Sequence, residues 1–303
     1  MKNKAMKTSA MLLAMAMMMG TVLTGCSGGS ADATTAAAAT TAAGDTTAAA
    51  DAGTATDGVP ADVQKIIDAG VLKVGCKVDV PNFSLQNTST GEYEGYETDI
   101  AYTIAGKIFG CTADEAREKG LVAFQGVSAK TRGPLLDNDE VDLVIATFTI
   151  TEERKESWNF STSYFTDAVG FLVLKDSGIT SMADMDGKVI GVSRSSTSKD
   201  GFRAYAEENG IDVEPTFEDF DTYPELAAAL ASKNIDVFCV DRAILSGYVD
   251  DTNVLLDDRF AEQEYGVASK KSNTGLADLV EGVITDLASS GEMEKMLTEW
   301  GLN

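Results

Sequence analysis

Histidine is absent from the 303 residues of this sequence. The chain therefore cannot build a His-based catalytic triad, an imidazole metal site or a histidine pH switch. Cysteine is scarce, and the four cysteines form no C-x-x-C pair, so zinc sites and thioredoxin-like redox sites are unsupported. We therefore expect neither a metal nor another cofactor.

Positive charge is also in short supply. Twenty-four Lys and Arg residues face 48 Asp and Glu residues, which gives a formal net charge of −24. Phosphate contacts need clustered Lys and Arg, so the composition disfavours nucleic-acid binding. It also disfavours a polybasic patch that would hold an anionic membrane.

The N-terminus has the pattern of an export signal over residues 1–25. Three lysines precede an apolar run at 10–22 that is too short to span a bilayer comfortably. The signal ends in L-T-G-C, which resembles a bacterial lipobox and implies that Cys26 becomes a lipidated N-terminus. Lipid chains would hold the protein on the extracytoplasmic face of the cell membrane. The other interpretation is an ordinary signal followed by a buried structural cysteine.

A low-complexity segment follows at 26–58. After its cysteine it consists of Ala, Thr, Ser, Gly and Asp, with no Val, Ile, Leu or aromatic residue. Such a composition cannot bury a core, so we interpret it as a flexible tether. Residues 59–303 remain, which is enough for one large or two modest domains.

The remainder alternates apolar strand patterns with helical patterns. Expected strands lie at 71–75, 121–124, 141–145, 169–174, 187–192, 212–217, 235–240 and 265–268. Expected helices lie at 60–70, 99–110, 129–137, 198–209, 223–231, 276–287 and 292–300. This order predicts an α/β fold with crossover connections, in which ligands bind beyond the carboxyl ends of the strands.

The pattern divides into two similar α/β lobes. Lobe 1 is expected at 59–165 plus 266–303, because the last strand and helices return to it. Lobe 2 is expected at 166–265. Two crossings between the lobes, near 164–168 and 261–265, form a hinge around a cleft.

The stretch 145–155, I-A-T-F-T-I-T-E-E-R-K, is the centre of the predicted site. It combines a strand end, a polar turn with Thr147 and Thr149, and one helical turn that carries Arg154. An arginine offers a planar two-pronged donor, and hydroxyls and backbone N–H groups can complete a cage for a carboxylate. A polar loop with a solvated arginine is the other interpretation.

Other polar residues fall at neighbouring strand ends. Lys77 follows the first strand, and Arg132 can reach the same place from a helix. The hydroxyl-rich turn 193–198 opens a helix, where free N–H groups either bind an anion or receive an ordinary cap. Asp241 ends a strand, where it can hold an ammonium group or cap the next helix.

A series of motifs resembles one family in order and spacing. The motifs are V-L-K-V-G (71–75), G-Y-E-T-D-I-A (95–101), V-D-L-V-I-A-T-F-T-I-T-E-E-R-K (141–155), N-F-S-T-S-Y-F (159–165), S-M-A-D-M-D-G-K-V-I-G-V (181–192), I-D-V-F-C-V-D (235–241) and E-Y-G-V-A-S-K-K (264–271). They resemble the amino-acid-binding solute-binding proteins (family 3) of bacterial ABC importers. The resemblance implies the type II periplasmic-binding-protein fold. Segments 75–83 and 128–138 are most similar to the aspartate/glutamate binders.

The resemblance implies which residues hold the α-carboxylate and the α-ammonium group of a bound amino acid. Arg154 would clamp the α-carboxylate, helped by Thr149 and by the Thr197–Ser198 turn of lobe 2. Asp241 would take the α-ammonium group, with Tyr223 nearby.

The resemblance also implies that Lys77, Arg132 and Thr147 hold a side-chain carboxylate. The chain departs from the family at Val80, where many members carry an aromatic residue. Val80 argues against a large cationic or aromatic ligand side chain. The expected ligand is therefore aspartate or glutamate. Glutamine or another polar amino acid is the alternative, which would leave Lys77 and Arg132 as surplus positive charge.

The implied function is non-catalytic capture by a monomer, which closes its lobes on the ligand and delivers it to the membrane subunits of an ABC importer. A dehydratase-like enzyme on this fold would need a general acid or base other than histidine. A sensor subunit is a further alternative. Of the remaining cysteines, Cys239 is expected to be a buried small hydrophobe, and a Cys76–Cys111 disulfide is left open.

Overall fold

The computed structural model describes residues 58–303. The predicted export signal at 1–25, the lipidation site Cys26 and the predicted tether up to residue 57 lie outside the described residues. Within residues 58–303, no helix is both long enough and apolar enough to cross a membrane.

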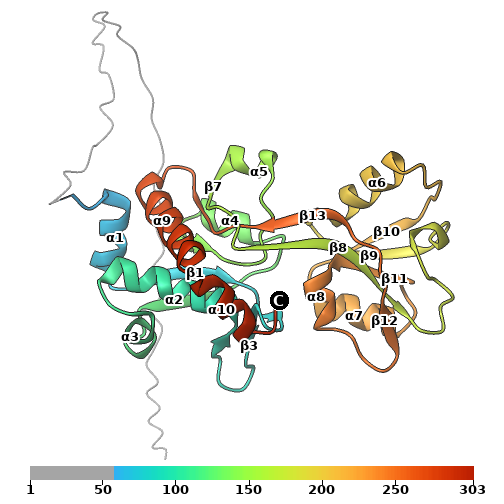
Figure 1. Cartoon of the computed structure of the whole chain (residues 1–303), viewed down its shortest axis with the longest axis horizontal. Coiled ribbons are helices and arrows are strands. Elements are labelled where there is room, and N and C mark those ends of the chain that lie inside the picture. The colour runs from blue at the N-terminus through green and yellow to red at the C-terminus, as the bar shows by residue number, and fades with distance from the viewer. Residues whose placement is uncertain (1–57) are drawn as a thin grey trace, which may run out of the picture. The chain divides into compact units, whose positions relative to one another are not determined.

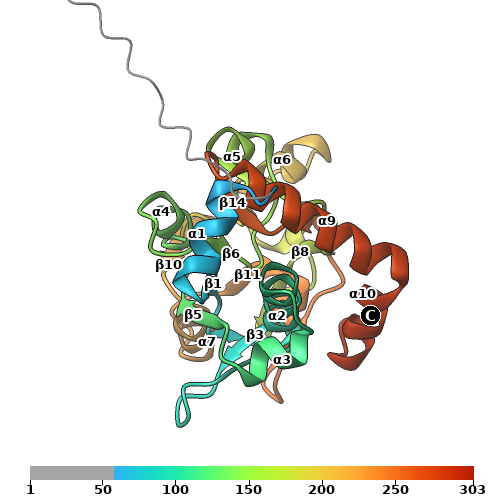
Figure 2. The ribbon, with the colours of Figure 1, turned by 90° about the vertical axis from the view of Figure 1, so that its left-hand side faces the viewer.

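The first sheet is mixed and has five strands (Figures 1 and 2). In spatial order they are β5 (Val122–Gly126), β1 (Leu72–Cys76), β6 (Leu143–Val144), β14 (Ala268–Lys270) and β7 (Trp158–Phe160). β1 is parallel to β5 and β6, whereas β14 is antiparallel to β6 and β7. The accompanying helices are α1 (Ala61–Ala69), α2 (Tyr96–Phe109), α3 (Ala113–Glu118), α4 (Arg132–Asp137), α5 (Glu152–Ser157), α9 (Thr274–Ser290) and α10 (Glu292–Glu299). A small sheet of β2 (Asp79–Val80), β3 (Ser84–Gln86) and β4 (Tyr93–Glu94) lies beside them.

The second sheet has six strands. Its order is β10 (Thr216–Phe220), β9 (Val189–Ser193), β11 (Val237–Asp241), β8 (Phe165–Leu174) and β12 (Asn253–Leu255), and β13 (Phe260–Tyr265) also pairs with β8. The other elements are the 3-10 helix η1 (Met182–Asp184), α6 (Ser198–Glu208), α7 (Tyr223–Ala231) and α8 (Arg242–Ser246). β11 is buried along its whole length, as is typical of a central strand covered on both faces.

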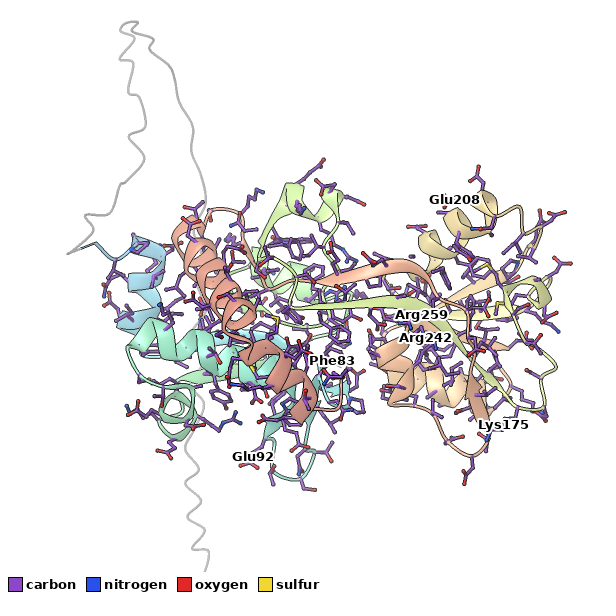
Figure 3. All side chains as sticks on the ribbon, viewed as in Figure 1. Phe83, Glu92, Lys175, Glu208, Arg242 and Arg259 are labelled. Carbon is purple, nitrogen blue, oxygen red and sulfur yellow. The ribbon has the colours of Figure 1, made fainter. Side chains whose placement is uncertain are left out.

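The antiparallel strands β8 and β13 join the two sheets and run side by side in Figure 1. An aromatic cluster lies at the end of these strands nearest the first sheet. The ring centroid of Phe83, labelled in Figure 3, is 5.0 Å from Phe165 and 6.0 Å from Tyr265. The predicted α/β fold with two lobes and a two-segment connection is confirmed. The lobe boundaries at about 165 and 266 stay a prediction.

Two element predictions differ from the structure. The single strand expected at 265–268 is two strands, β13 and β14, which belong to different sheets. The break falls at Gly266, where an added Cβ would lie 2.9 Å from the Ile150 side chain. The strand expected at 212–217 lies instead at Thr216–Phe220 and is β10. Pairing with β9, and not the apolar residues of the segment, determines where this strand begins and ends.

The cysteine predictions have mixed outcomes. Cys239 lies fully buried in β11, which confirms its predicted place in the core. Cys76, Cys111 and Cys239 are all free, so the disulfide that the sequence left open is not formed.

Candidate functional site

A small cavity lies between the two lobes at the carboxyl ends of strands. Its lining comes from both lobes and consists of Ala129, Arg132, Thr147, Thr149, Ser196, Thr197, Ser198, Tyr223, Val240 and Asp241. Every predicted ligand-binding residue except Lys77 and Arg154 lines it. The cavity volume is about 10 Å³, which is the space that one water molecule needs. An amino acid could therefore enter only if the lobes moved apart.

Arg132 and the turn at Thr147 form one wall. Arg132 Nη1 donates hydrogen bonds to the carbonyl oxygens of Ala146 (2.8 Å) and Thr147 (2.9 Å), and its guanidinium lies 4.0 Å from the Phe148 ring centroid. Thr147 has φ +44°, a left-handed conformation that is uncommon for a β-branched residue. Such strain is typical of ligand clamps and active sites.

Glu97 supports this turn from behind, and the sequence analysis gave it no role. Its Oε1 accepts hydrogen bonds from the Thr147 N–H (2.5 Å) and the Tyr164 hydroxyl (2.6 Å). Glu97 is fully buried, and burial raises its pKa despite these two hydrogen bonds. The motif G-Y-E-T-D-I-A contained Glu97, but nothing in its spacing pointed to the Thr147 turn.

Arg154 lies on α5, beside the small cavity and not in its lining. Its Nη1 donates to the Thr149 carbonyl oxygen (2.7 Å), and its Nη2 donates to the Ser195 carbonyl oxygen (3.2 Å) in lobe 2. Burial and, to a lesser extent, the nearby charge of Arg132 together lower its pKa to about 9. Arg154 also lines an adjacent cleft of about 800 Å³ that shares Thr149 and Thr197 with the small cavity.

Gln263, on the connecting strand β13, joins hydroxyl groups of both lobes. Its Oε1 accepts hydrogen bonds from Thr149 Oγ1 and from Thr197 Oγ1, each at 2.7 Å. The strand is irregular before it, because Ala261 has φ +47° and the register shifts between Phe260 and Glu262. The sequence analysis did not identify Gln263, since its partners come from distant segments.

Asp241 ends β11 and is the acidic residue of the cavity. Its Oδ2 accepts a hydrogen bond from the Tyr265 hydroxyl at 2.5 Å. The pKa of Asp241 is raised to about 7, mainly by burial and also by the charge of Asp167. The Tyr265 hydrogen bond and the charges of Arg132 and Arg154 oppose it. A cationic group bound here would stabilise the ionised carboxylate.

Lys77 is placed differently from the expectation that it faces a ligand. It is buried, and its Nζ lies 3.3 Å from Asp79 Oδ1 and 4.2 Å from the ring centroid of Tyr223, which lines the cavity. Asp79 Oδ2 in turn accepts the Tyr223 N–H at 3.2 Å. Lys77 therefore already has a buried carboxylate partner two residues along the chain.

These neighbours change the charge balance of the site. The sequence alone suggested that Lys77 and Arg132 are surplus positive charge unless the ligand side chain is acidic. The structure adds Asp79 beside Lys77 and Glu97 beside the Thr147 turn. The cations around the cavity are therefore not in excess over the acidic residues.

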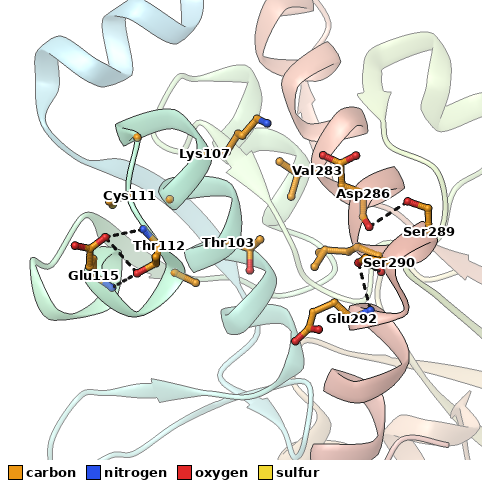
Figure 4. A pocket seen from close by; sticks show the side chains of 14 residues that line it. Thr103, Lys107, Cys111, Thr112, Glu115, Val283, Asp286, Ser289, Ser290 and Glu292 are labelled. Carbon is orange, nitrogen blue, oxygen red and sulfur yellow. Dashed lines mark hydrogen bonds between the residues drawn. The ribbon is translucent and has the colours of Figure 1, made fainter.

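A wider groove of about 940 Å³ lies elsewhere, between α2 and α3 on one side and α9 and α10 on the other (Figure 4). None of the predicted site residues lines it. The hydrogen bonds drawn in Figure 4 are local to helix ends, such as the one between Glu115 and Thr112. The predicted site residues therefore gather at the small cavity and not at this groove.

Comparison with known proteins gives the following similarities. A model of the bacterial extracellular solute-binding proteins, family 3, matches residues 72–303. The ABC transporter glutamine-binding protein GlnH of Bacillus subtilis (strain 168) is 35% identical over 239 residues, which are 78% of this chain and 82% of the relative. A glutamine-binding protein of Geobacillus stearothermophilus is 36% identical over 212 residues, which are 69% of this chain and 76% of the relative. Among solved structures, an ancestral arginine-binding protein bound to glutamine has a TM-score of 0.65 at 28% identity, and the match covers 77% of this chain and 99% of that one.

Proposed function

Because this chain belongs to family 3 of the bacterial extracellular solute-binding proteins, we propose that it captures an amino acid between its lobes and delivers it to an ABC importer. The observation that carries this proposal is the small cavity, which brings Arg132 and Asp241 together with hydroxyls of both lobes. The names of the two glutamine-binding relatives support it.

The proposed contacts pair both charges of an amino-acid main chain. Arg154, Thr149 and the Thr197–Ser198 turn bind the α-carboxylate, and Asp241 binds the α-ammonium group beside Tyr223. Burying a charge without a partner costs roughly several kcal/mol of free energy. A zwitterionic amino acid therefore suits a site that offers both a cationic and an anionic partner. Lys77, Arg132 and Thr147 lie toward the ligand side chain, with Lys77 acting through its contact with Tyr223.

Glutamine is the ligand that we favour. The acids around the cavity are at least as numerous as the cations, so the site needs no negative ligand side chain to balance its charge. The similarity to glutamine-binding relatives supports the same choice.

Aspartate or glutamate is the second candidate, as the sequence predicted. It is favoured by Arg132, which lines the cavity and whose side-chain hydrogen bonds within residues 58–303 go to carbonyl oxygens. A side-chain carboxylate could pair with that guanidinium.

We propose that the lobes move about the segments 164–168 and 261–265. The open form binds the amino acid on lobe 1, and the ligand then stabilises the closed form through the added contacts of lobe 2. The small cavity volume supports this order of events, because the cavity as it stands has no room for an amino acid.

The proposal places the protein outside the cytoplasmic membrane as a lipid-anchored monomer. Residues 1–25 would direct export, Cys26 would carry the lipid, and the segment up to residue 58 would act as the tether. The family match supports the extracytoplasmic location, and the sequence pattern alone supports the anchor.

Titration calorimetry tests the function. The mature chain, carrying Cys26→Ala so that no lipid is attached, is stripped of ligand and titrated with glutamine, glutamate and aspartate. We expect a micromolar or tighter Kd for at least one of them, equivalent to about −8 kcal/mol or better. An Arg154→Ala variant should lose this binding. If no amino acid binds the unmodified site, the proposed function is wrong.

A further inference from the structure

A pocket beside the connecting strand β8 shares no lining residue with the small cavity. We call it the hinge pocket, and among its lining are Thr166, Asp167, Arg242, Arg259 and residues 301–303. Its volume is about 400 Å³, a size typical of small-molecule sites. None of the residues that we assign to the amino acid lines it. A ligand in the hinge pocket would therefore be separate from the amino acid.

Two arginines give the hinge pocket its charge. Arg242 on α8 and Arg259 just before β13 both line it, and Figure 3 labels both. Of the acidic side chains in residues 58–303, Asp167 alone lines the pocket. Within the same residues neither arginine forms an ion pair, although the chain has 48 acidic and 24 basic residues. The side chains of the hinge pocket therefore leave one positive charge in excess.

Arg242 is held in place without a ligand. Its Nη1 donates hydrogen bonds to the carbonyl oxygens of Leu256 and Asp258, the second at 2.8 Å. Its side chain lies against Gly170 of β8, where an added Cβ would be 2.6 Å from Arg242 Cγ. Its Nε and Nη2, which form one edge of the guanidinium, donate to no group within residues 58–303. Two parallel N–H donors on a fixed guanidinium match two oxygens of a phosphate or carboxylate group.

Asp167 does not compete for these donors. Its Oδ1 accepts a hydrogen bond from the Ala168 N–H and its Oδ2 accepts one from the Ala243 N–H, each at 2.8 Å. Burial raises the pKa of Asp167, and the charges of Arg259 and Arg242 act in the opposite direction. The acid is therefore occupied by backbone groups, and the arginine donors that face the pocket are left for another anion.

We propose that the hinge pocket binds a small oxyanion, which is a phosphate or carboxylate group held between Arg242 and Arg259. The Thr166 hydroxyl, which also lines the pocket, can donate a further hydrogen bond. This anion site lies apart from the proposed amino-acid site, and its existence does not depend on that function.

The position of the hinge pocket links the anion to lobe movement. Residues 301–303 follow α10, which accompanies the first sheet, whereas Arg242 and Arg259 belong to lobe 2. A movement of the lobes about residues 164–168 changes the distance between these two walls. The anion therefore binds best to the arrangement described here, in which the lobes are closed. Because linkage is reciprocal, the anion should strengthen amino-acid binding, and this part of the inference rests on the proposed function.

Inorganic phosphate tests the anion site on the mature chain with Cys26→Ala and without an amino acid. Calorimetry measures the Kd for phosphate, and chloride at equal ionic strength is the reference. We expect saturable binding with a millimolar or tighter Kd, and binding at least tenfold weaker in Arg259→Gln. Arg259 is exposed, so this variant should fold normally.

Arg203→Gln is the matched control, since it removes an exposed arginine of α6 that does not line the hinge pocket. Its Kd for phosphate should equal that of the unsubstituted chain. Phosphate binding that is no stronger than chloride binding would overturn the proposal. Equal phosphate binding by Arg259→Gln would also overturn it, because the anion would then lie elsewhere.

A titration with glutamine, with and without saturating phosphate, tests the linkage. We expect phosphate to lower the Kd for glutamine at least threefold in the unsubstituted chain and to leave it unchanged in Arg259→Gln. An unchanged or higher Kd in the unsubstituted chain would contradict the linkage. If the chain binds no amino acid at all, the proposed function is wrong, and the phosphate titration still decides whether the anion site exists.

Discussion

Asp167 caps the helix that follows Asp241. Asp241 occupies the N-cap position of α8 but makes no side-chain cap hydrogen bond. The Ala243 N–H of that helix donates instead to Asp167 Oδ2 at 2.8 Å. Asp167 lies on β8, which pairs with β11, so the capping group comes from the neighbouring strand. The Asp241 carboxylate is therefore left to the cavity, which excludes the capping interpretation, while its contact with an ammonium group stays a prediction.

Because Asp167 caps the helix and Asp241 does not, substitutions of the two aspartates should have different effects, one on ligand binding and one on stability. Asp241→Asn should weaken amino-acid binding by about 2–5 kcal/mol, since it leaves the ligand ammonium group without its charged partner. Asp167→Ala should lower the free energy of unfolding by about 0.5–2 kcal/mol through loss of the cap. Calorimetry measures the first effect and urea unfolding the second. Normal binding by a destabilised Asp241→Asn would show that Asp241 has a structural role and does not bind the ligand.

Binding should depend on pH through Asp241. Its pKa of about 7 in the ligand-free protein is raised mainly by burial, so the carboxyl group takes up a proton as the pH falls through 7. Its contribution to folding stability is therefore full below the ordinary pKa of about 4 and is lost as the pH rises through 7. Ligand affinity has the opposite sign, because the ammonium group needs the ionised form.

Calorimetry between pH 5.5 and 8 checks this prediction. The Kd should rise by up to about tenfold for each pH unit below 7. The chain has no histidine that would titrate in this range. The Asp241→Asn variant is the control, and its residual binding should vary less with pH. An equally steep profile in that variant would assign the pH dependence to another group.

Gln263 should control how firmly the lobes close. Gln263→Met keeps the length of the side chain but replaces its carboxamide with an apolar group. The substitution therefore removes the oxygen that accepts hydrogen bonds from Thr149 and Thr197. We expect the ligand-free variant to have a larger radius of gyration by X-ray scattering, and ligand should restore the compact value. Gln125→Met, an exposed change on β5, is the matched control. Identical scattering of the Gln263 variant and the unsubstituted chain would rule out this role.

Lys77 should matter for stability more than for ligand charge. Lys77→Met leaves Asp79 buried without its cation, which should cost about 3–5 kcal/mol in the free energy of unfolding. The double variant Lys77→Met with Asp79→Leu should recover most of this loss, because it removes both charges. Urea unfolding measures both variants. A selective loss of glutamate binding in Lys77→Met, without loss of stability, would instead support direct contact with a ligand carboxylate.

Much of the cavity could be predicted from the sequence because its residues follow strand ends. Thr147 and Thr149 follow β6, Thr197 follows β9, and Asp241 ends β11. Parallel strands align their carboxyl ends at one edge of a sheet, so position along the chain was enough to place these residues. The helix predicted at 223–231 is confirmed for a similar reason, since its start has the local pattern of a capping box with Pro in the first turn.

The buried partners could not be predicted in this way. Glu97 and Thr147 are 50 positions apart, and Thr149 and Gln263 are 114 positions apart. The strand expected at 265–268 failed for a related reason, because the switch between sheets at Gly266 depends on contact with Ile150. Nothing in the local sequence records which distant group a buried polar side chain meets.

By itself the sequence determined the α/β class, the two lobes and most of the side chains that line the cavity. Those features depend on local periodicity, caps and strand ends, which a short segment specifies on its own. Only the tertiary structure decided the charge balance of the site. It pairs Lys77 with Asp79 and places Glu97 beside Arg132 and Thr147. The effect of a buried charge depends on every charge within a few ångströms of it, and folding alone brings those charges together.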